Sequence, residues 1–326
     1  MEPYDGSLTR LGGALEYDFG WNKRLETFAD TSYITMEKPY LVPKEAYAIV
    51  LGTSFTMSPR ITWTNYFVYD QKLKILVVHL ASANLNEIID VYLASENPPK
   101  FLLIESFEPD FLKYIFKVSK QIEKMESLPL LSVPVKHKLN NDLRDFSTKP
   151  FFVSRSKNIK LKERFRLAGD YIYKKIFGRL LSVTKVIAIN CEHCFSSNIK
   201  DKMLIFSSSL SKSKLAMGKA SQAAEKIGFI KNIIESNGAT KFGYMIMPYK
   251  INIYTDYASN INPPTLYHSV LNQEENGFIN VRAVLMTAVK KGVSDIYLPN
   301  DHHYGADGSR LTAKLVANIL LKEGSN

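Results

Sequence analysis

The sequence is poor in cysteine and contains no long apolar run. Two cysteines occur among 326 residues, which is too few for a fold that relies on a framework of disulfides. No stretch reaches the roughly 18 consecutive apolar residues that a membrane-spanning helix needs. The first ten residues, MEPYDGSLTR, lack the apolar character of a secretory signal. A chain of this length with 45% hydrophobic residues can instead bury a sizeable core, so we expect a globular fold.

The two cysteines lie close together in the segment INCEHCF, where Cys191 and Cys194 enclose His193. These three side chains fall short of the four ligands that a structural zinc site normally has. The flanking residues also do not mark the strand-to-helix turn that is typical of a redox-active C-x-x-C pair. We interpret the pair as incidental thiols, with a zinc site and a redox dithiol as the alternatives.

The charge balance is basic, with a formal net charge of +10 from 42 Lys and Arg against 32 Asp and Glu. The cations are densest between residues 134 and 220. Such a surface favours anionic partners, either a membrane surface or an acidic polymer, although a solvated face is the simpler interpretation. Because we find no nucleic-acid-binding motif, nucleic acid is not expected as a partner.

Short apolar runs alternate with helical patterns along much of the chain. The runs at 46–52, 73–80, 101–106, 242–248 and 294–300 have the length and composition of buried strands. This alternation predicts an α/β fold, with a parallel sheet of about five strands covered by helices on both faces. The expected architecture is a flavodoxin-like three-layer domain.

The chain is predicted to consist of an arm and one domain that carries an insertion. Residues 1–45 show little periodicity and are expected to be an N-terminal extended arm. Residues 46–326 would form the α/β domain. Within this domain, the interval 125–215 is too long for a single crossover and carries prolines, serine clusters and much of the basic charge. We expect this interval to be a helical, basic insertion or lid.

A serine follows the first predicted strand. Ligands in open parallel sheets bind beyond the carboxyl ends of the strands, so polar residues at these ends are candidates for a site. Ser54, in the segment LGTSF, stands at a strand-to-helix turn, where a helix N-terminus favours a developing oxyanion. Capping of the helix is the simpler role for such a serine.

An acid and two histidines follow the last predicted strand, in the segment PNDHHYG. A serine nucleophile needs a base within hydrogen-bond reach and a carboxylate that orients this base. Asp301 can fold back to Nδ1 of His303, which leaves Nε2 of that ring for Ser54. His302 is then expected to face the other way, as a spacer. A solvated loop and a metal site are the alternatives, and the metal site is less favoured because the other histidines are scattered.

The two segments resemble the first and last sequence blocks of the SGNH hydrolases and acyltransferases. They are most similar to the alginate-acetyltransferase-like and DHHW-type branches, in VLGTSF near the start and DHHYGADGSRLTAKLVA near the end. The segments FLLIESFEPDF, MIMPYKINIYTDYAS and GSLTRLGGALEYDFGWN are similar to further motifs of these and related exopolysaccharide proteins. The resemblance covers most of the chain outside the 125–215 interval.

This resemblance implies an SGNH-type serine acyltransferase in a bacterial cell envelope. Ser54 would be the nucleophile, His303 the base and Asp301 the orienting residue, while the Ser54 N–H and a group near Ala83 and Asn84 would hold the oxyanion. An acetyl group would pass through Ser54 to a hydroxyl of an extracytoplasmic polysaccharide. No metal and no cofactor are implied, and the acetyl donor would be an acetylated carrier or a membrane-bound O-acyltransferase partner.

The resemblance also implies a location. We expect an extracytoplasmic protein, in the periplasm or at the cell surface, that is associated with a membrane. Its anchor or signal would be missing from this sequence. The basic 125–215 interval is expected to contact the membrane surface or an anionic glycan.

The sequence departs from the family pattern at three positions. Thr53 replaces the aspartate of the usual Gly-Asp-Ser, Pro109 stands where the acidic strand-three motif has an arginine, and Ala83 occupies a position often held by glycine. No Gly-x-Asn-Asp block is visible, so the oxyanion hole is the least defined part of the site. Two other functions stay open: a carbohydrate acetylesterase with the same triad, and a catalytically silent glycan-binding subunit of an export complex.

Overall fold

The structure is a computed structural model of the chain. It describes residues 34–36, 46–57, 62–93, 96–126, 184–210, 212, 219–259, 261, 263, 265 and 277–323. Among the described residues, no helix is long and apolar enough to span a bilayer.

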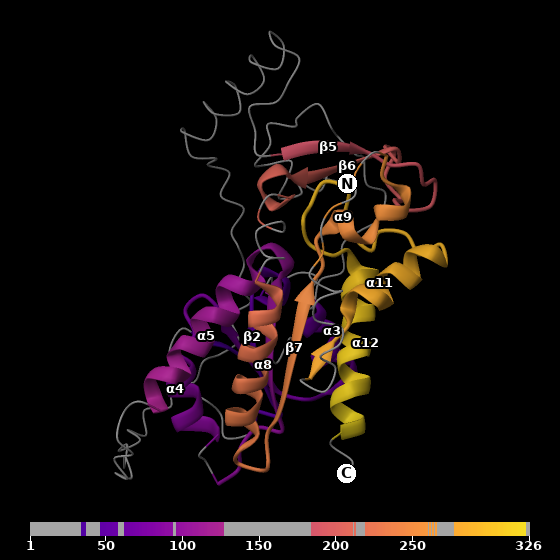
Figure 1. The fold of residues 1–326 in the computed structure, drawn as a ribbon. Helices are drawn as coiled ribbons and strands as arrows, with labels where there is room; N and C mark the ends of the chain where they lie inside the picture. Colours follow the sequence, from indigo (N-terminus) through magenta and orange to yellow (C-terminus); the bar gives the residue numbers. More distant parts are fainter. Residues whose placement is uncertain are drawn as a thin grey trace, which may run out of the picture.

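A six-stranded parallel sheet forms the centre of the fold (Figure 1). The strand order is β1-β3-β2-β4-β7-β8. The two middle strands are therefore β2 and β4, with β3 and β1 on one side and β7 and β8 on the other. The strands are β1 (Ile34–Met36), β2 (Ala48–Gly52), β3 (Ile75–His79), β4 (Phe101–Phe107), β7 (Lys241–Met247) and β8 (Phe278–Ile279).

The side chains of each strand alternate between two hydrophobic cores. Ala48 and Val50 of β2 pack into one core, whereas Ile49 and Leu51 pack into the other, as the two-residue period of a strand requires. Helices from different parts of the chain complete each core. The first core is covered by α3 (Trp63–Gln71), α11 (Val281–Lys290) and α12 (Ala306–Glu323), and the second by α4 (Leu85–Ile88), α5 (Phe111–Glu126) and α8 (Ala220–Glu235). The predicted three-layer α/β architecture is therefore confirmed.

Short helical turns follow the carboxyl ends of the central strands, where a site is expected. β2 leads into α2 (Ser54–Met57), and β4 leads into the 3-10 turn η3 (Glu108–Asp110). β7 leads into α9 (Lys250–Ile253), which is followed by the 3-10 turn η4 (Thr255–Tyr257). A π-helical turn, η2 (Ile89–Leu93), continues α4.

The prediction of a strand at 294–300 is wrong. This segment is a loop in which Tyr297 forms only an isolated bridge with Tyr304. The N–H of Tyr297 donates to the Tyr254 hydroxyl at 3.1 Å, so a side chain takes the place of a ladder partner. Asp295 has a φ of 58°, in the left-handed region, which interrupts an extended run. The segment is apolar because it passes through the first core, and β8 forms this edge of the sheet instead.

The described part of the 125–215 interval is mainly a β-hairpin, so the prediction of a helical insertion is wrong for this part. β5 (Thr184–Ala188) and β6 (Lys202–Phe206) pair in antiparallel register. They lie at one end of the molecule, beyond the tip of the β7 arrow (Figure 1). The segment before β5, 127–183, lies outside the described residues.

The predicted N-terminal arm is described only at residues 34–36. These residues form β1, which pairs in parallel with β3 at an edge of the sheet. The rest of the 1–45 segment lies outside the described residues.

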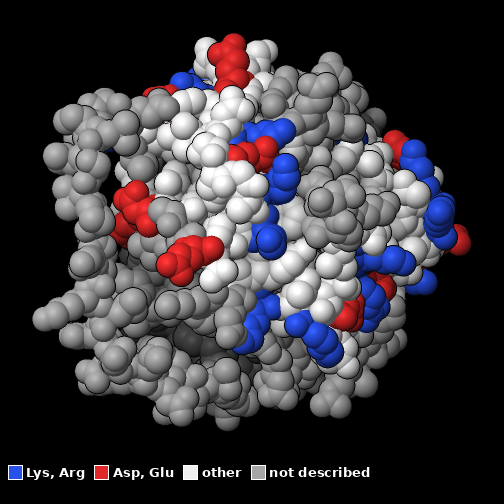
Figure 2. All heavy atoms as spheres, turned by 90° about the horizontal axis from the view of Figure 1, so that it is seen from below, with Lys and Arg blue, Asp and Glu red and all other residues white. Residues whose placement is uncertain are grey.

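Exposed lysines stand at the amino ends of the strands, opposite the end where α2 and α9 begin. Lys74 and Lys100 immediately precede β3 and β4, and Lys241 begins β7. Figure 2 views the molecule from below and shows Lys and Arg side chains running across this face, with Asp and Glu side chains among them. Basic residues are therefore not confined to the 125–215 interval, much of which lies outside the described residues.

Candidate active site

The structure brings Ser54, His303 and Asp301 together from opposite ends of the chain. Ser54 begins α2 directly beyond β2, and its side chain is exposed. Its Oγ lies 2.8 Å from Nε2 of His303. Nδ1 of the same ring lies 2.8 Å from Oδ1 of Asp301. Both separations are hydrogen-bond distances, so the three side chains have the relative placement that a nucleophile, a base and an orienting carboxylate need.

The Asp301 carboxylate is buried and folds back over its own loop. Its side chain is 3% exposed, and Oδ1 also accepts a hydrogen bond from the backbone N–H of His303 at 3.0 Å. A neutral His303 ring protonated at Nδ1 can donate to Asp301 and accept from the Ser54 hydroxyl at Nε2. The carboxylate thus fixes the orientation in which the imidazole can act as a base.

The buried Lys250 holds the loop that carries Asp301. Lys250 begins α9 and is 1% exposed. Its Nζ donates to the carbonyl oxygens of Leu298 at 3.1 Å, Pro299 at 3.0 Å and Asp301 at 2.8 Å. Burial lowers the pKa of Lys250 to about 7, and the negative charge of Asp301 offsets part of this shift. Because all three partners are backbone carbonyls of one loop, Lys250 is a positioning group.

A buried glutamate supports the turn at the nucleophile. Glu105, near the end of β4, accepts hydrogen bonds from the N–H of Thr53 at 2.9 Å, from the Thr53 hydroxyl at 2.7 Å and from the Thr56 hydroxyl. Burial raises the pKa of Glu105, while these hydrogen bonds and the electrostatic interaction with His303 lower it. An acid on the neighbouring strand therefore supports the turn in which Thr53 replaces the expected aspartate.

Close packing of the same turn requires Gly52. A Cβ at this position would lie 2.4 Å from Oγ1 of Thr56. Thr56 is fixed, because its hydroxyl donates to Glu105 and accepts from the indole N–H of Trp63 at 3.3 Å. The close approach of Thr56 thus explains why residue 52 is a glycine.

The predicted oxyanion loop follows β3, next to the nucleophile turn. β2 and β3 pair in register up to Gly52 and His79, so the loop begins beside Ser54. The N–H of Ala83 donates to the His79 carbonyl at 2.9 Å, so this donor is already occupied. Asn84 is exposed, and its side chain does not cap α4. Within the described residues, no hydrogen bond is found from the Ser54 N–H. This N–H and the side-chain amide of Asn84 are therefore the donors that remain for an oxyanion.

His302 lies beside His303, and the prediction that it faces the other way is wrong. The two ring centroids are 3.7 Å apart, and Nδ1 of His302 lies 3.6 Å from Oδ1 of Asp301. The ring has apolar partners on this side of the loop, which explains its orientation. Its centroid lies 5.3 Å, 6.1 Å and 6.3 Å from those of Phe206, Phe55 and Phe107, respectively.

A second buried glutamate ties the turn after β4 to the turn after β7. Oε2 of Glu108 accepts from the N–H of Tyr249 at 2.9 Å and from the amide of Asn252 at 2.6 Å. The Tyr249 hydroxyl donates to the carbonyl of Phe206, which attaches the β5–β6 hairpin to the same group of loops. Pro109, which replaces the expected arginine, lies buried within the η3 turn.

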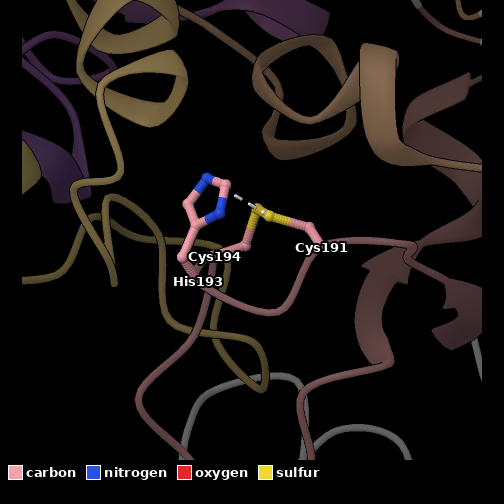
Figure 3. Close-up of side chains that lie close together, drawn as sticks. All are labelled: Cys191, His193 and Cys194. Atoms are coloured by element: carbon pink, nitrogen blue, oxygen red, sulfur yellow. Dashed lines mark hydrogen bonds between the residues drawn. A yellow bond between two sulfur atoms is a disulfide. The ribbon is translucent and has the colours of Figure 1, made fainter.

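The two cysteines form a disulfide, so their interpretation as incidental thiols is wrong. Figure 3 shows the Cys191–Cys194 bond with the His193 ring beside it. Nε2 of His193 lies 3.1 Å from the carbonyl oxygen of Val289, and the Cys194 carbonyl accepts from the Asp295 N–H at 2.9 Å. The closed turn therefore packs against the segment that leads to the Asp301 loop. In the disulfide form the sulfurs are not the thiolates that zinc binds.

Asp301 and the two histidines that follow it are also close enough together to bind a metal ion. Side-chain ligand atoms of Asp301, His302 and His303 lie within 4.8 Å of one another, as metal ligands do. However, both ring nitrogens of His303 lie at hydrogen-bond distance from Ser54 and Asp301. This arrangement favours acid–base chemistry over metal coordination.

Comparisons with known proteins do not identify a family. No family model, no curated protein and no solved structure matches the chain. The resemblance to the SGNH hydrolases and acyltransferases therefore rests on the sequence motifs and stays a prediction.

Proposed function

We propose that the protein is an SGNH-type serine acyltransferase that moves an acetyl group through Ser54 onto a hydroxyl of an extracytoplasmic polysaccharide. The observation that carries this proposal is the continuous hydrogen-bond chain from Ser54 through His303 to the buried carboxylate of Asp301. A serine that only caps a helix needs no imidazole at its hydroxyl. A solvated histidine likewise needs no buried carboxylate at Nδ1, so the chain supports a catalytic role.

The first half-reaction transfers the acetyl group to Ser54. Its Oγ attacks the acetyl carbonyl carbon of the donor, and Nε2 of His303 takes the hydroxyl proton. The Ser54 N–H and the Asn84 amide donate to the oxyanion of the tetrahedral intermediate. The bond between the acetyl carbon and the donor then breaks, and His303 gives its proton to the leaving group. The product is an acetyl ester on Ser54.

The second half-reaction reverses these roles. A sugar hydroxyl loses its proton to Nε2 of His303 as its oxygen attacks the acetyl carbon. The bond to Ser54 Oγ breaks, and His303 returns the proton to the serine. Asp301 stabilises the transient imidazolium and holds its orientation without taking the proton.

The extracytoplasmic setting is part of the proposal. The Cys191–Cys194 disulfide supports it, because disulfides persist mainly in oxidising compartments such as the periplasm and the cell surface. The acetyl donor, either an acetylated carrier or a membrane-bound O-acyltransferase partner, and the association with a membrane are proposed from the motif resemblance. Contact of the 125–215 interval with a membrane or an anionic glycan stays a prediction, because much of this interval lies outside the described residues.

A carbohydrate acetylesterase is the second candidate, and the exposure of Ser54 favours it. Transfer prevails over hydrolysis only where water is kept from the acyl-enzyme. The protein can be incubated with trifluoroethyl acetate and a cello-oligosaccharide, and free acetate and acetylated sugar can then be quantified by mass spectrometry. Acetylated sugar above the level of a Ser54→Ala control would support the transferase, whereas acetate alone would indicate the esterase.

The roles of the two histidines can be tested with the same small ester. His303→Ala should lower its turnover by at least about a thousandfold, because the serine loses its base. His302→Ala should keep most of the turnover, since the nitrogen at hydrogen-bond distance from the Ser54 hydroxyl belongs to His303. Equal losses in two folded variants would contradict the assignment of the base.

A further inference from the structure

We propose that Phe107, Phe206 and His302 form an acceptor subsite that takes the apolar face of a sugar ring. This inference rests on the proposed transfer through Ser54 and names the alcohol that this site selects. The three rings come from the end of β4, the end of β6 and the loop after 300. All three are partly exposed, whereas the neighbouring Phe55 is 3% exposed and belongs to the core.

The three rings form one surface that reaches the base. The centroid of His302 lies 5.3 Å from that of Phe206 and 6.3 Å from that of Phe107. His302 also contacts His303, with 3.7 Å between the ring centroids and 41° between the ring planes. A ligand that lies against this surface is therefore next to the imidazole that carries Nε2.

The position beside His303 belongs to the alcohol and not to the acetyl group. The attacking hydroxyl must come within hydrogen-bond reach of Nε2, because its proton is transferred there. The acetyl oxygen must instead point towards the oxyanion donors, at Ser54 and Asn84. Side chains that flank His303 thus contact the alcohol, either the acceptor or the leaving group of the donor.

The chemistry of the subsite fits a ring with one apolar face and polar edges. Partly exposed aromatic rings gain stability when an apolar surface covers them. Phe206 is followed directly by Ser207 and Ser208, which are exposed, so the rings border a polar stretch of the surface. A pyranose combines a face of C–H groups with a rim of hydroxyls.

The subsite is held in place by backbone contacts. The Tyr249 hydroxyl donates to the Phe206 carbonyl, and the Leu204 N–H donates to the Pro299 carbonyl at 2.8 Å. These bonds join β6 to α9 and to the loop of His302. Such pre-organisation lowers the entropy lost when a ligand binds.

The test uses Phe206→Ala, with Phe229→Ala on α8 as the matched control. Trifluoroethyl acetate serves as the donor, and methyl β-D-glucopyranoside and glycerol serve as two acceptors. Loss of one ring contact should raise KM for the glucoside about two- to tenfold. Transfer to glycerol should not change, because glycerol has no ring face, and Phe229→Ala should behave as the wild type. An unchanged KM for the glucoside, or an equal change for glycerol, would overturn the proposal.

A binding measurement separates this proposal from the catalytic one. Saturation-transfer NMR with methyl β-D-glucopyranoside can be recorded on Ser54→Ala and on Ser54→Ala with Phe206→Ala. Transfer to the axial C–H protons of the sugar in the first protein, and its loss in the second, would support the subsite even if the wild type transferred no acetyl group. Equal signals in both proteins would overturn the subsite, and acetyl transfer by the wild type would then still uphold the catalytic role of Ser54.

Discussion

The buried Lys250 should make the protein more stable as the pH rises above neutrality. The unfolded chain keeps this lysine protonated up to about pH 10.5, whereas the folded protein keeps it protonated only up to about pH 7. Between these values the unfolded state binds more protons, so the free energy of unfolding increases with pH. One pH unit in this window contributes at most about 1.4 kcal/mol. Between pH 7 and pH 9, the lysine should therefore add about 2 kcal/mol.

Urea unfolding of the wild type and of Lys250→Met at pH 6, 7, 8 and 9 measures this contribution. Methionine has a similar length but leaves three buried carbonyl groups without their donor, and each such group is worth about 1–3 kcal/mol. Lys250→Met should therefore be less stable at every pH, and the difference from the wild type should widen by about 2 kcal/mol between pH 7 and pH 9. A difference that stays constant from pH 6 to pH 9 would refute a depressed pKa of the buried amine.

Three further predictions concern the turn at the nucleophile and the disulfide. Gly52→Ala should lower ester turnover at least about tenfold and destabilise the protein by about 1–3 kcal/mol, because the added methyl group meets Thr56; a wild-type rate and urea midpoint would contradict this steric role. Glu105→Gln should keep most of the stability, since the amide oxygen can still accept hydrogen bonds, whereas Glu105→Leu should lose about 2–4 kcal/mol in urea unfolding; equal losses would contradict the role of the carboxylate as an acceptor. Replacing Cys191 and Cys194 with serine should lower the free energy of unfolding by about 2 kcal/mol, as expected for a short loop, and a reductant should affect only the wild type; equal effects of the reductant on both proteins would argue against the disulfide.

The sheet could be predicted where hydrophobic runs are short and bounded by glycine or proline. The runs that became β2, β4 and β7 have this form, and the run that became β3 is equally short but has no glycine or proline beside it. The structure confirms all four strands. The run at 294–300 looks the same, but its polar backbone groups are bound by a tyrosine hydroxyl and by other loops. A sequence shows that such a segment is buried, but not which groups satisfy its backbone.

The three residues of the proposed triad could be predicted from the sequence, but the buried residues that hold them in place could not. Ser54 stands out because it follows a predicted strand, and Asp301 and His303 stand out because an acid and a histidine lie two residues apart in PNDHHYG. Lys250 and Glu105 could not be recognised as supports, since charged residues are seldom fully buried and their partners are distant in sequence. The segments PYKIN and FLLIESFEPD did contain them, but the pattern carries no signal for which carbonyl or N–H group each one binds.

The hairpin and the orientation of His302 were missed for a related reason. β5 and β6 lie in a basic, serine-rich interval with little apolar alternation, and their contacts with the site run through Tyr249 and Pro299. The neighbours that turn His302 towards His303 come from three separate elements. Contacts of this kind follow from the fold and not from local sequence.

Covalent labelling of Ser54 tests the central claim most directly. The wild type, Ser54→Ala and His303→Ala would be treated with methanesulfonyl fluoride, and the peptide containing position 54 would be followed by mass spectrometry. We predict modification of Ser54 in the wild type, none of this peptide in Ser54→Ala, and labelling at least about a hundredfold slower in His303→Ala. No modification of a folded wild type, or equal labelling rates with and without His303, would contradict the proposed triad and favour a catalytically silent protein.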